Sequence, residues 1–299
     1  MSFYEQVSAN RTKTIGLFII FFILVAFLGF IFSYFLGDTL LVLPIFMGFS
    51  ILYLLISYFA GDKIVLAISS AKEADPVKYQ RFHNVAEEMA IAAGIPKPKL
   101  YVINDTAMNA FATGRDPQHS VVCATTGLLE TMNRDELQGV IAHEMSHIKN
   151  FDIRVMMLTA VLVSFTVLLS DLLLRFVFYG GLRSRDNNNK SGGLFLVLLV
   201  FAILLAIITP IIAQLIKFAI SRSREYLADA SAAELTRYPQ GLASALAKIS
   251  GDKEVLEAAN KATAHLYIAN PLKGQKLWMM SLFSTHPDIN DRIKRLRAM

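Results

Sequence analysis

Two long apolar runs near the start of the chain restrict its fold more than any other feature. The first run, residues 14–36, has 23 residues without a charged side chain, and as a helix it would extend about 34 Å, enough to cross a bilayer. The second run, residues 39–60, has 22 uncharged residues and follows after only Gly37 and Asp38. The spacing predicts a tight hairpin of two transmembrane helices. A cleaved signal peptide is disfavoured because the first run is too long and lacks a small-residue cleavage site.

The composition agrees with a membrane protein. Hydrophobic residues make up 54% of the 299 residues and charged residues 18%, which is more apolar than an ordinary soluble domain. The formal net charge is +5. In a membrane protein such a charge reflects topology and anionic lipid headgroups, and no nucleic-acid motif is present, so we expect a lipid partner and no nucleic acid. The single cysteine, Cys123, excludes a disulfide and a cysteine zinc cluster, so any metal site must use histidines and carboxylates.

Two further apolar runs, residues 155–178 and 194–220, flank a loop rich in Gly, Asn and Ser at residues 179–193. They predict a second hairpin. The third run contains Asp171 and Arg175, one helical turn apart, which can neutralise each other near the membrane edge. The fourth run contains Pro210, Gln214 and Lys217. These residues are typical of a kinked helix with an interfacial lysine, so a transport pathway is disfavoured.

Two hairpins place residues 61–154 and residues 221–299 on the same side of the membrane as the N-terminus. Basic residues next to the runs gather on this side: Arg11, Lys13, Lys63, Lys72, Lys217, Arg222 and Arg224. They mark it as the cytoplasmic side, against a smaller basic set in the opposite loop. We therefore divide the chain into a hairpin (1–60), a polar part (61–154), a second hairpin (155–220) and a second polar part (221–299).

The first polar part mixes predicted helices and strands. A helical pattern opens at Pro76 and stops before Gly94. Short strands are predicted at 100–103, 110–113 and 121–124. Asn133 is a good N-cap for a helix that runs to about Lys149, with acidic residues in its first turn. In the tail, the patterns of residues 241–249 and 254–268 predict amphipathic helices that cover this core, and a final helix is expected at 288–296.

The helix after Asn133 carries the pattern H-E-x-x-H at His143, Glu144 and His147. Residues four apart lie on one face of a helix, so the two imidazoles can share one zinc ion. Glu144 lies beside them. Two solvated histidines on a surface helix are the alternative, which is disfavoured because the apolar stripe of this helix lies on a different side.

A catalytic zinc needs a third protein ligand and one open position. The best candidate is Glu225, which follows the fourth apolar run. Asp229, one turn further on, is placed to accept a hydrogen bond from a ligand histidine. The alternative for Glu225 is an ion pair with Arg222 or Arg224 on a solvated face.

Over nearly its whole length the chain resembles the membrane-bound zinc metalloproteases of the HtpX type, relatives of the CAAX prenyl protease and of Oma-type proteases. The resemblance rests on Met-Asn-Ala-Phe-Ala-Thr-Gly at 108–114, Asn-Arg-Asp-Glu-Leu at 133–137 before H-E-x-x-H, Glu225 with Asp229, and Thr-His-Pro at 285–287. It implies an α+β membrane protein, mostly helical, with about four transmembrane helices and a gluzincin-like catalytic domain that contains a small β-sheet. It also strengthens Glu225 as the third ligand of a single Zn²⁺.

The resemblance further implies a mechanism. Glu144 would take a proton from a zinc-polarised water and return it to the leaving amine. His286 would donate to the oxyanion, although a structural role at the start of the final helix is an equal alternative. An edge strand formed by Asn109, Ala110, Phe111, Ala112 and Thr113 would pair with an extended substrate, which explains weak sequence preference.

The family resemblance implies cleavage of misfolded or damaged membrane proteins, or of unfolded polypeptides, at the cell membrane. Three alternatives have less support in the sequence. An intramembrane protease is disfavoured because polar residues flank H-E-x-x-H on both sides. A transporter has only thin support, from Asp171, Arg175 and Gln214. An inactive scaffold would be expected to lack Glu144 or a ligand, and this chain keeps them.

Overall fold

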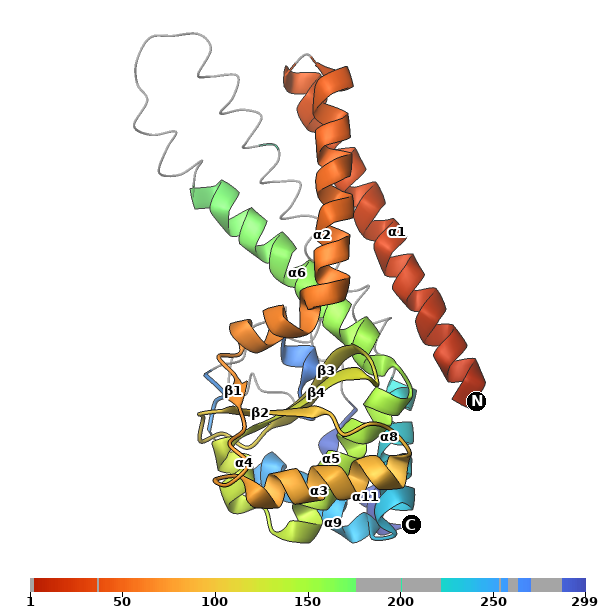
Figure 1. Ribbon diagram of the computed structural model, residues 1–299, viewed down its shortest axis with the longest axis vertical. Helices are drawn as coiled ribbons and strands as arrows, with labels where there is room; N and C mark the ends of the chain where they lie inside the picture. Colours follow the sequence, from red (N-terminus) through yellow and green to blue (C-terminus); the bar gives the residue numbers. More distant parts are fainter. Residues whose placement is uncertain are drawn as a thin grey trace.

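The computed structural model describes residues 3–36, 38–175, 200, 222–252, 254–257, 263–269 and 287–299. Three long helices, α1, α2 and α6, extend from a domain in which helices cover a small sheet (Figure 1). In chain order the described elements are α1 (Phe3–Leu36), α2 (Thr39–Ile68), β1 (Lys72–Glu73), α3 (Gln80–Ala93), β2 (Lys99–Ile103), β3 (Ala110–Asp116), β4 (His119–Thr125), α4 (Thr126–Thr131), α5 (Arg134–Lys149), α6 (Asp152–Arg175), α8 (Arg222–Thr236), α9 (Pro239–Gly251), the short 3-10 helix η2 (Ala264–Leu266) and α11 (Ile289–Arg297).

Helices α1 and α2 form the predicted hairpin and pack side by side (Figure 1). Ser8–Phe27 in α1 and Thr39–Ile68 in α2 are the segments within the described residues that are long and apolar enough to cross a membrane. In the apolar window of α2 only 11% of the residues are buried inside the protein. Within the described part of the chain, most of its apolar surface therefore has no protein partner, as expected for a helix that faces lipid.

Both helices are longer than the apolar runs that predict them. Helix α1 begins at Phe3, and its polar first part reaches the domain that contains the sheet, where Asn10 is buried. Helix α2 continues to Ile68, eight residues past the predicted end, because Val65 and Leu66 pack in a core beneath the sheet. The apolar run predicts which part of a helix can contact lipid. The end of the helix depends on packing against the rest of the protein.

Helix α6 contains the first part of the third apolar run. Its first three turns pack inside the protein, where Ile153, Val155, Leu158 and Val161 are all fully buried. The predicted fourth span, residues 194–220, and the loop before it lie outside the described residues apart from Val200. The second hairpin and the total of four spans stay predictions.

The sheet is mixed and has the strand order β1–β2–β4–β3. Strands β2 and β4 are parallel, and β3 runs antiparallel to β4 at the edge. The three predicted strands are confirmed, and the two-residue β1 adds a strand that was too short to predict. Helix α3 begins at Gln80, later than predicted, because the Asp75 carboxylate accepts the N–H groups of Val77 and Lys78 and forms a turn there.

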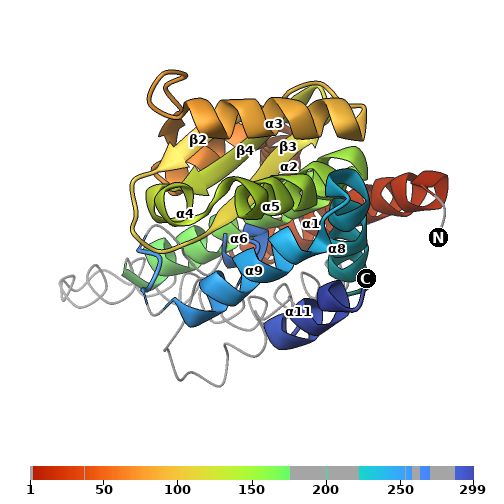
Figure 2. The ribbon, with the colours of Figure 1, turned by 90° about the horizontal axis from the view of Figure 1, so that it is seen from below.

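Alternating side chains of β3 and β4 separate two cores. Ala110, Ala112 and Val122 face a core with α3, α5 and α9, whereas Phe111 and Cys123 face a core formed with the bases of α2 and α6. Figure 2 shows α3 and α5 against one face of the sheet, with α9 and α11 beyond α5. Helix α5 therefore runs through the middle of the domain, between the sheet and the tail helices.

The tail differs from prediction. Residues 239–251 and 289–297 are helical as expected. Of the predicted helix 254–268, however, the described residues contain only the 3-10 turn Ala264–Leu266, and the Ile268 N–H donates to the Ala110 carbonyl at the edge of β3. An unpaired strand edge offers main-chain acceptors that compete with helix formation in a short amphipathic segment.

Candidate metal centre

Helix α5 begins with a complete capping box. The Asn133 side chain accepts the Glu136 N–H, and the Glu136 side chain accepts the Asn133 N–H. Asp135 and Glu136 also complement the helix dipole at this end. The helix is buried over the stretch that carries H-E-x-x-H, with His143, Glu144 and His147 all at most 4% exposed. The predicted N-cap and helix are confirmed.

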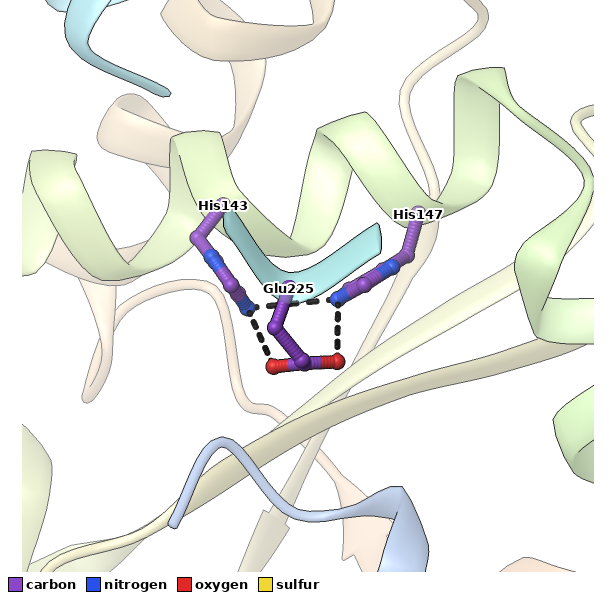
Figure 3. A group of neighbouring side chains, drawn as sticks. All are labelled: His143, His147 and Glu225. Atoms are coloured by element: carbon purple, nitrogen blue, oxygen red, sulfur yellow. Dashed lines mark hydrogen bonds and ion pairs between the residues drawn. The ribbon is translucent and has the colours of Figure 1, made fainter. Parts of the chain in front are cut away.

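Three side chains converge on one point (Figure 3). His143 and His147 come from one face of α5, and Glu225 comes from α8, which packs against it. The two Nε2 atoms lie 3.2 Å apart. Glu225 reaches both, with Oε2 at 3.7 Å from His143 and Oε1 at 3.6 Å from His147.

The chemistry and spacing of this donor set fit a divalent metal. Ligand atoms about 2.1 Å from a tetrahedral zinc are about 3.4 Å from one another, close to the three distances found here. Two imidazole nitrogens and one carboxylate are the donors that a catalytic zinc uses, and they leave one position for water or substrate. His143, His147 and Glu225 could therefore hold one metal ion.

Each ligand histidine has a carboxylate behind it. Nδ1 of His143 lies 3.0 Å from Asp229, and Nδ1 of His147 is hydrogen-bonded to Asp152 at 3.0 Å. A carboxylate at Nδ1 holds the proton there and leaves the Nε2 lone pair for a metal. Asp229 is where the sequence placed it, and the structure pairs it with His143.

Asp152 was missed by sequence reasoning, which counted it only as a polar residue flanking the motif. Helix α5 ends at Lys149, and Phe151, with φ of 60°, separates it from α6, whose first residue, Asp152, lies 3.0 Å from Nδ1 of His147. The available signal was an aspartate five residues after the second histidine, at the start of an apolar run.

Arg292 was also missed. Its side chain is 1% exposed and donates two hydrogen bonds to Asp229, at 2.8 and 2.7 Å, and a third to the Ile268 carbonyl. Burial alone would raise the pKa of Asp229, but the hydrogen bonds and charge of Arg292 hold it far below its usual value. The signal was a basic residue on the apolar face of the last helix, between Ile289 and Ile293.

The electrostatics favour positive charge between the ligands. Two carboxylates are neutralised by arginines at 2.7 Å, Asp152 by Arg224 and Asp229 by Arg292. The carboxylates of Glu144 and Glu225 lie beside the histidines, and Nη1 of Arg292 is also 3.8 Å from Oε2 of Glu225. Burial would lower the pKa of His147, but the Asp152 hydrogen bond and the charges of Glu225 and Asp152 raise it to about 9. The negative charge that raises this pKa also favours a divalent cation between the ligands.

Glu144 lies at the edge of the sheet. It is 2% exposed, and burial raises its pKa, against the lowering effect of the two histidines and of a hydrogen bond from the Ala112 backbone. The Asn109 carbonyl accepts the Thr125 N–H of β4, whereas the Ala110 carbonyl accepts the Ile268 N–H of the tail. Because alternate residues of an antiparallel strand bond to the neighbouring strand, the main-chain groups of Ala110 and Ala112 point away from β4. The acid–base group and the outer edge of β3 therefore meet.

Four of the five residues expected to bind substrate divide into two groups, and the fifth, Thr113, is fully buried. Ala110 and Ala112 present main-chain groups outward, and the Ala110 carbonyl already accepts from Ile268. The Asn109 side chain bonds to Ala269 and to the Ala110 N–H, and Phe111 packs on the Tyr267 ring. These side chains hold the tail against the sheet. Binding of substrate by the five residues stays a prediction.

The other histidines lie apart from this centre. His83 contacts the Ala74 carbonyl, His119 contacts Asp116, and His265 contacts the Met156 carbonyl. These contacts are typical of histidines with structural roles. His286 lies outside the described residues.

Comparisons with known proteins also indicate a metalloprotease. The model of Peptidase family M48 matches residues 76–299. A protein named Protease HtpX homolog from Caldanaerobacter subterraneus is 46% identical over 299 residues, which covers 99% of this chain and 97% of that protein. Proteins of the same name from Dictyoglomus thermophilum and Streptococcus uberis are 48% and 42% identical, over 100% and 99% of this chain and 95% and 99% of theirs.

A solved structure also shares the fold. The crystal structure of S. mikatae Ste24p matches with a TM-score of 0.51 at 20% sequence identity, over 98% of this chain and 67% of that one. The family match covers most of the chain, including all three donor residues and Glu144. The chain therefore belongs to Peptidase family M48 and is a metalloprotease.

Proposed function

We propose that this chain is a membrane-anchored zinc endopeptidase that cleaves misfolded or damaged membrane proteins, with its active site facing the cytoplasm. The observation that carries the proposal is the meeting of three groups at one place. A His-His-Glu donor set, the carboxylate of Glu144 and the outer edge of β3 all adjoin. The first could hold a metal, the second can move a proton, and the third can align a peptide.

His143, His147 and Glu225 would hold zinc, whose chemistry there is to polarise a peptide carbonyl and acidify a water molecule. Glu144 accepts the proton of the attacking water, and its raised pKa suits it to pass that proton on to the leaving amine. His286, outside the described residues, is proposed as a donor to the oxyanion that develops on the carbonyl.

The edge of β3 suits an extended substrate of little fixed sequence. Ala112 directs its main-chain groups away from β4 next to Glu144. An added strand bonds to main-chain groups, which every peptide supplies, so unfolded segments would be preferred over particular sequences. The exposed apolar surface of α2 supports a membrane anchor that brings such substrates near.

Removing the metal is expected to stop cleavage without unfolding the protein. Apolar clusters above and below the sheet hold the helices in place and do not depend on the donor set. A chelator should therefore reduce cleavage of an unfolded membrane-protein substrate to background while helical circular dichroism is retained, and added Zn²⁺ should restore activity. Wholesale loss of helix on chelation would instead make the metal structural.

The orientation can be tested with introduced cysteines, because the single native Cys123 is buried. Val77 is 88% exposed on the domain, so V77C should react with a membrane-impermeant maleimide only after cells are permeabilised. S191C, in the loop predicted on the opposite side, should react in intact cells. The reverse labelling pattern would overturn the cytoplasmic assignment, and labelling of both only after permeabilisation would overturn the second hairpin.

A further inference from the structure

A polar side chain of the first membrane helix reaches the surroundings of the metal centre. Asn10, on α1, is 3% exposed although it lies just before the apolar run. Its Nδ2 donates to the Asn150 carbonyl at 2.8 Å and to Oδ1 of Asp152 at 2.7 Å. Its Oδ1 accepts from Nη1 of Arg224 at 2.6 Å. Both amide protons and the amide oxygen are thus used.

Asp152 joins this amide to a metal ligand. Its Oδ1 accepts from Asn10 and, at 2.7 Å, from Arg224 on α8, whereas its Oδ2 is bonded to Nδ1 of His147 at 3.0 Å. The carboxylate is therefore held on one side by groups from α1 and α8. On its other side it sets the orientation and the tautomer of His147.

The pattern of donors and acceptors fits an amide and nothing else of this size. The oxygen of Asn10 faces a guanidinium group, which only donates, and its nitrogen faces a carbonyl and a carboxylate, which only accept. An aspartate here would place a second carboxylate against Asp152. A leucine would fill similar space and make none of the three hydrogen bonds.

We propose that Asn10 is a positioning residue of the metal centre: the first membrane helix, through Asp152, fixes His147 for metal binding. The inference rests on the proposed zinc site. It makes α1 part of the metal site as well as a membrane anchor, because loss of the Asn10 contacts frees the Asp152 carboxylate to move and the imidazole of His147 with it.

The test measures zinc affinity in the full-length chain, purified in detergent. An E144Q parent avoids self-cleavage and keeps all three ligands. Zn²⁺ is titrated in competition with a chromophoric chelator against the parent, N10L, N10D and a matched control, T14V. Thr14 lies one turn further along α1, is buried, and bonds only to the Asn10 carbonyl of its own helix in the described structure.

N10L and N10D should each weaken zinc binding about tenfold or more, within the range typical of groups that orient a ligand from behind, and T14V should stay within about twofold of the parent. N10D is close to isosteric, so it keeps the test valid if N10L folds poorly. Melting of the zinc-free proteins reports folding separately. If N10L and N10D fold and bind zinc as tightly as the parent, the proposal is overturned.

A second background separates positioning from general destabilisation. In D152N the new amide cannot both accept from His147 and satisfy Arg224 and Asn10, so zinc affinity should fall by about 10- to 100-fold. If Asn10 acts through Asp152, N10L should add less than about twofold in this background. If N10L weakens zinc binding in the D152N background as much as it does in the parent, its effect is purely structural and the proposal is overturned.

These outcomes are distinct from those of the proposed function. The readout is zinc binding and needs no cleavage, so the inference stands if the parent binds zinc normally and the wild type cleaves no substrate tested. If the parent binds no zinc, both the zinc assignment and this inference are overturned.

Discussion

Replacing Glu144 by glutamine should abolish peptide hydrolysis and leave the metal site intact. Glu144 is buried beside the donor set but is not one of the three donors, so E144Q should still bind about one zinc per chain. Glutamine cannot accept the proton of the attacking water at neutral pH. Loss of a general base costs typically about 10²- to 10⁴-fold in rate, so kcat should fall by that much or to background.

The measurement is cleavage of an unfolded model membrane protein in detergent, with zinc content determined on the same samples. E130Q is a matched control, because Glu130 is exposed at the end of α4 and lies away from the donor set. It should cleave at the wild-type rate. Equal cleavage by wild type and E144Q would mean a contaminant or a different base, and zinc-loaded wild type without activity on any unfolded substrate would favour a scaffold.

Arg292→Met should be the most destabilising single substitution considered for this domain. The arginine is buried, and it makes three hydrogen bonds that tie α11 to Asp229 and to Ile268. Its loss leaves the Asp229 carboxylate buried without its counter-charge. Breaking a buried pair in this way costs about 3–5 kcal/mol, which we expect in the free energy of unfolding measured by denaturant titration in mild detergent.

R297M is the control on the same helix. Arg297 is exposed, so its replacement should change the free energy of unfolding by no more than about 0.5 kcal/mol. The pair also predicts acid sensitivity. Because Arg292 keeps the pKa of Asp229 below its unfolded value, the contribution is complete above about pH 4 and is lost as the pH falls further. Equal stability of R292M and wild type at pH 7 would contradict the assignment.

A double substitution distinguishes stability from function at this pair. Replacing both charges, as in D229L with R292M, removes the unpaired charge and should recover much of the lost free energy. It also removes the carboxylate 3.0 Å from Nδ1 of His143. Zinc affinity should therefore remain about 10- to 100-fold weaker although the protein folds. Recovery of zinc affinity together with stability would show that Asp229 has no orienting role.

Local features of this chain could be predicted from its sequence. The histidines of H-E-x-x-H share a face because a helix repeats every 3.6 residues, and the Asn133 cap is a contact within one turn. The α1–α2 hairpin follows from two adjacent apolar runs, each long enough to cross a membrane as a helix. Glu225 was a candidate from its type and position, and its approach to both histidines required α8 to pack on α5.

Contacts between distant segments could not be predicted from the sequence. The groups behind the ligand histidines come from α1, α6, α8 and α11, and their partners are set by how these helices pack around α5. The same holds for the tail, where Ile268 leaves a predicted helix to bond the edge of β3. Periodicity describes which face of a segment is buried. Which donor meets which acceptor in that buried space depends on the mutual placement of whole elements, because each buried polar group must find its partner there.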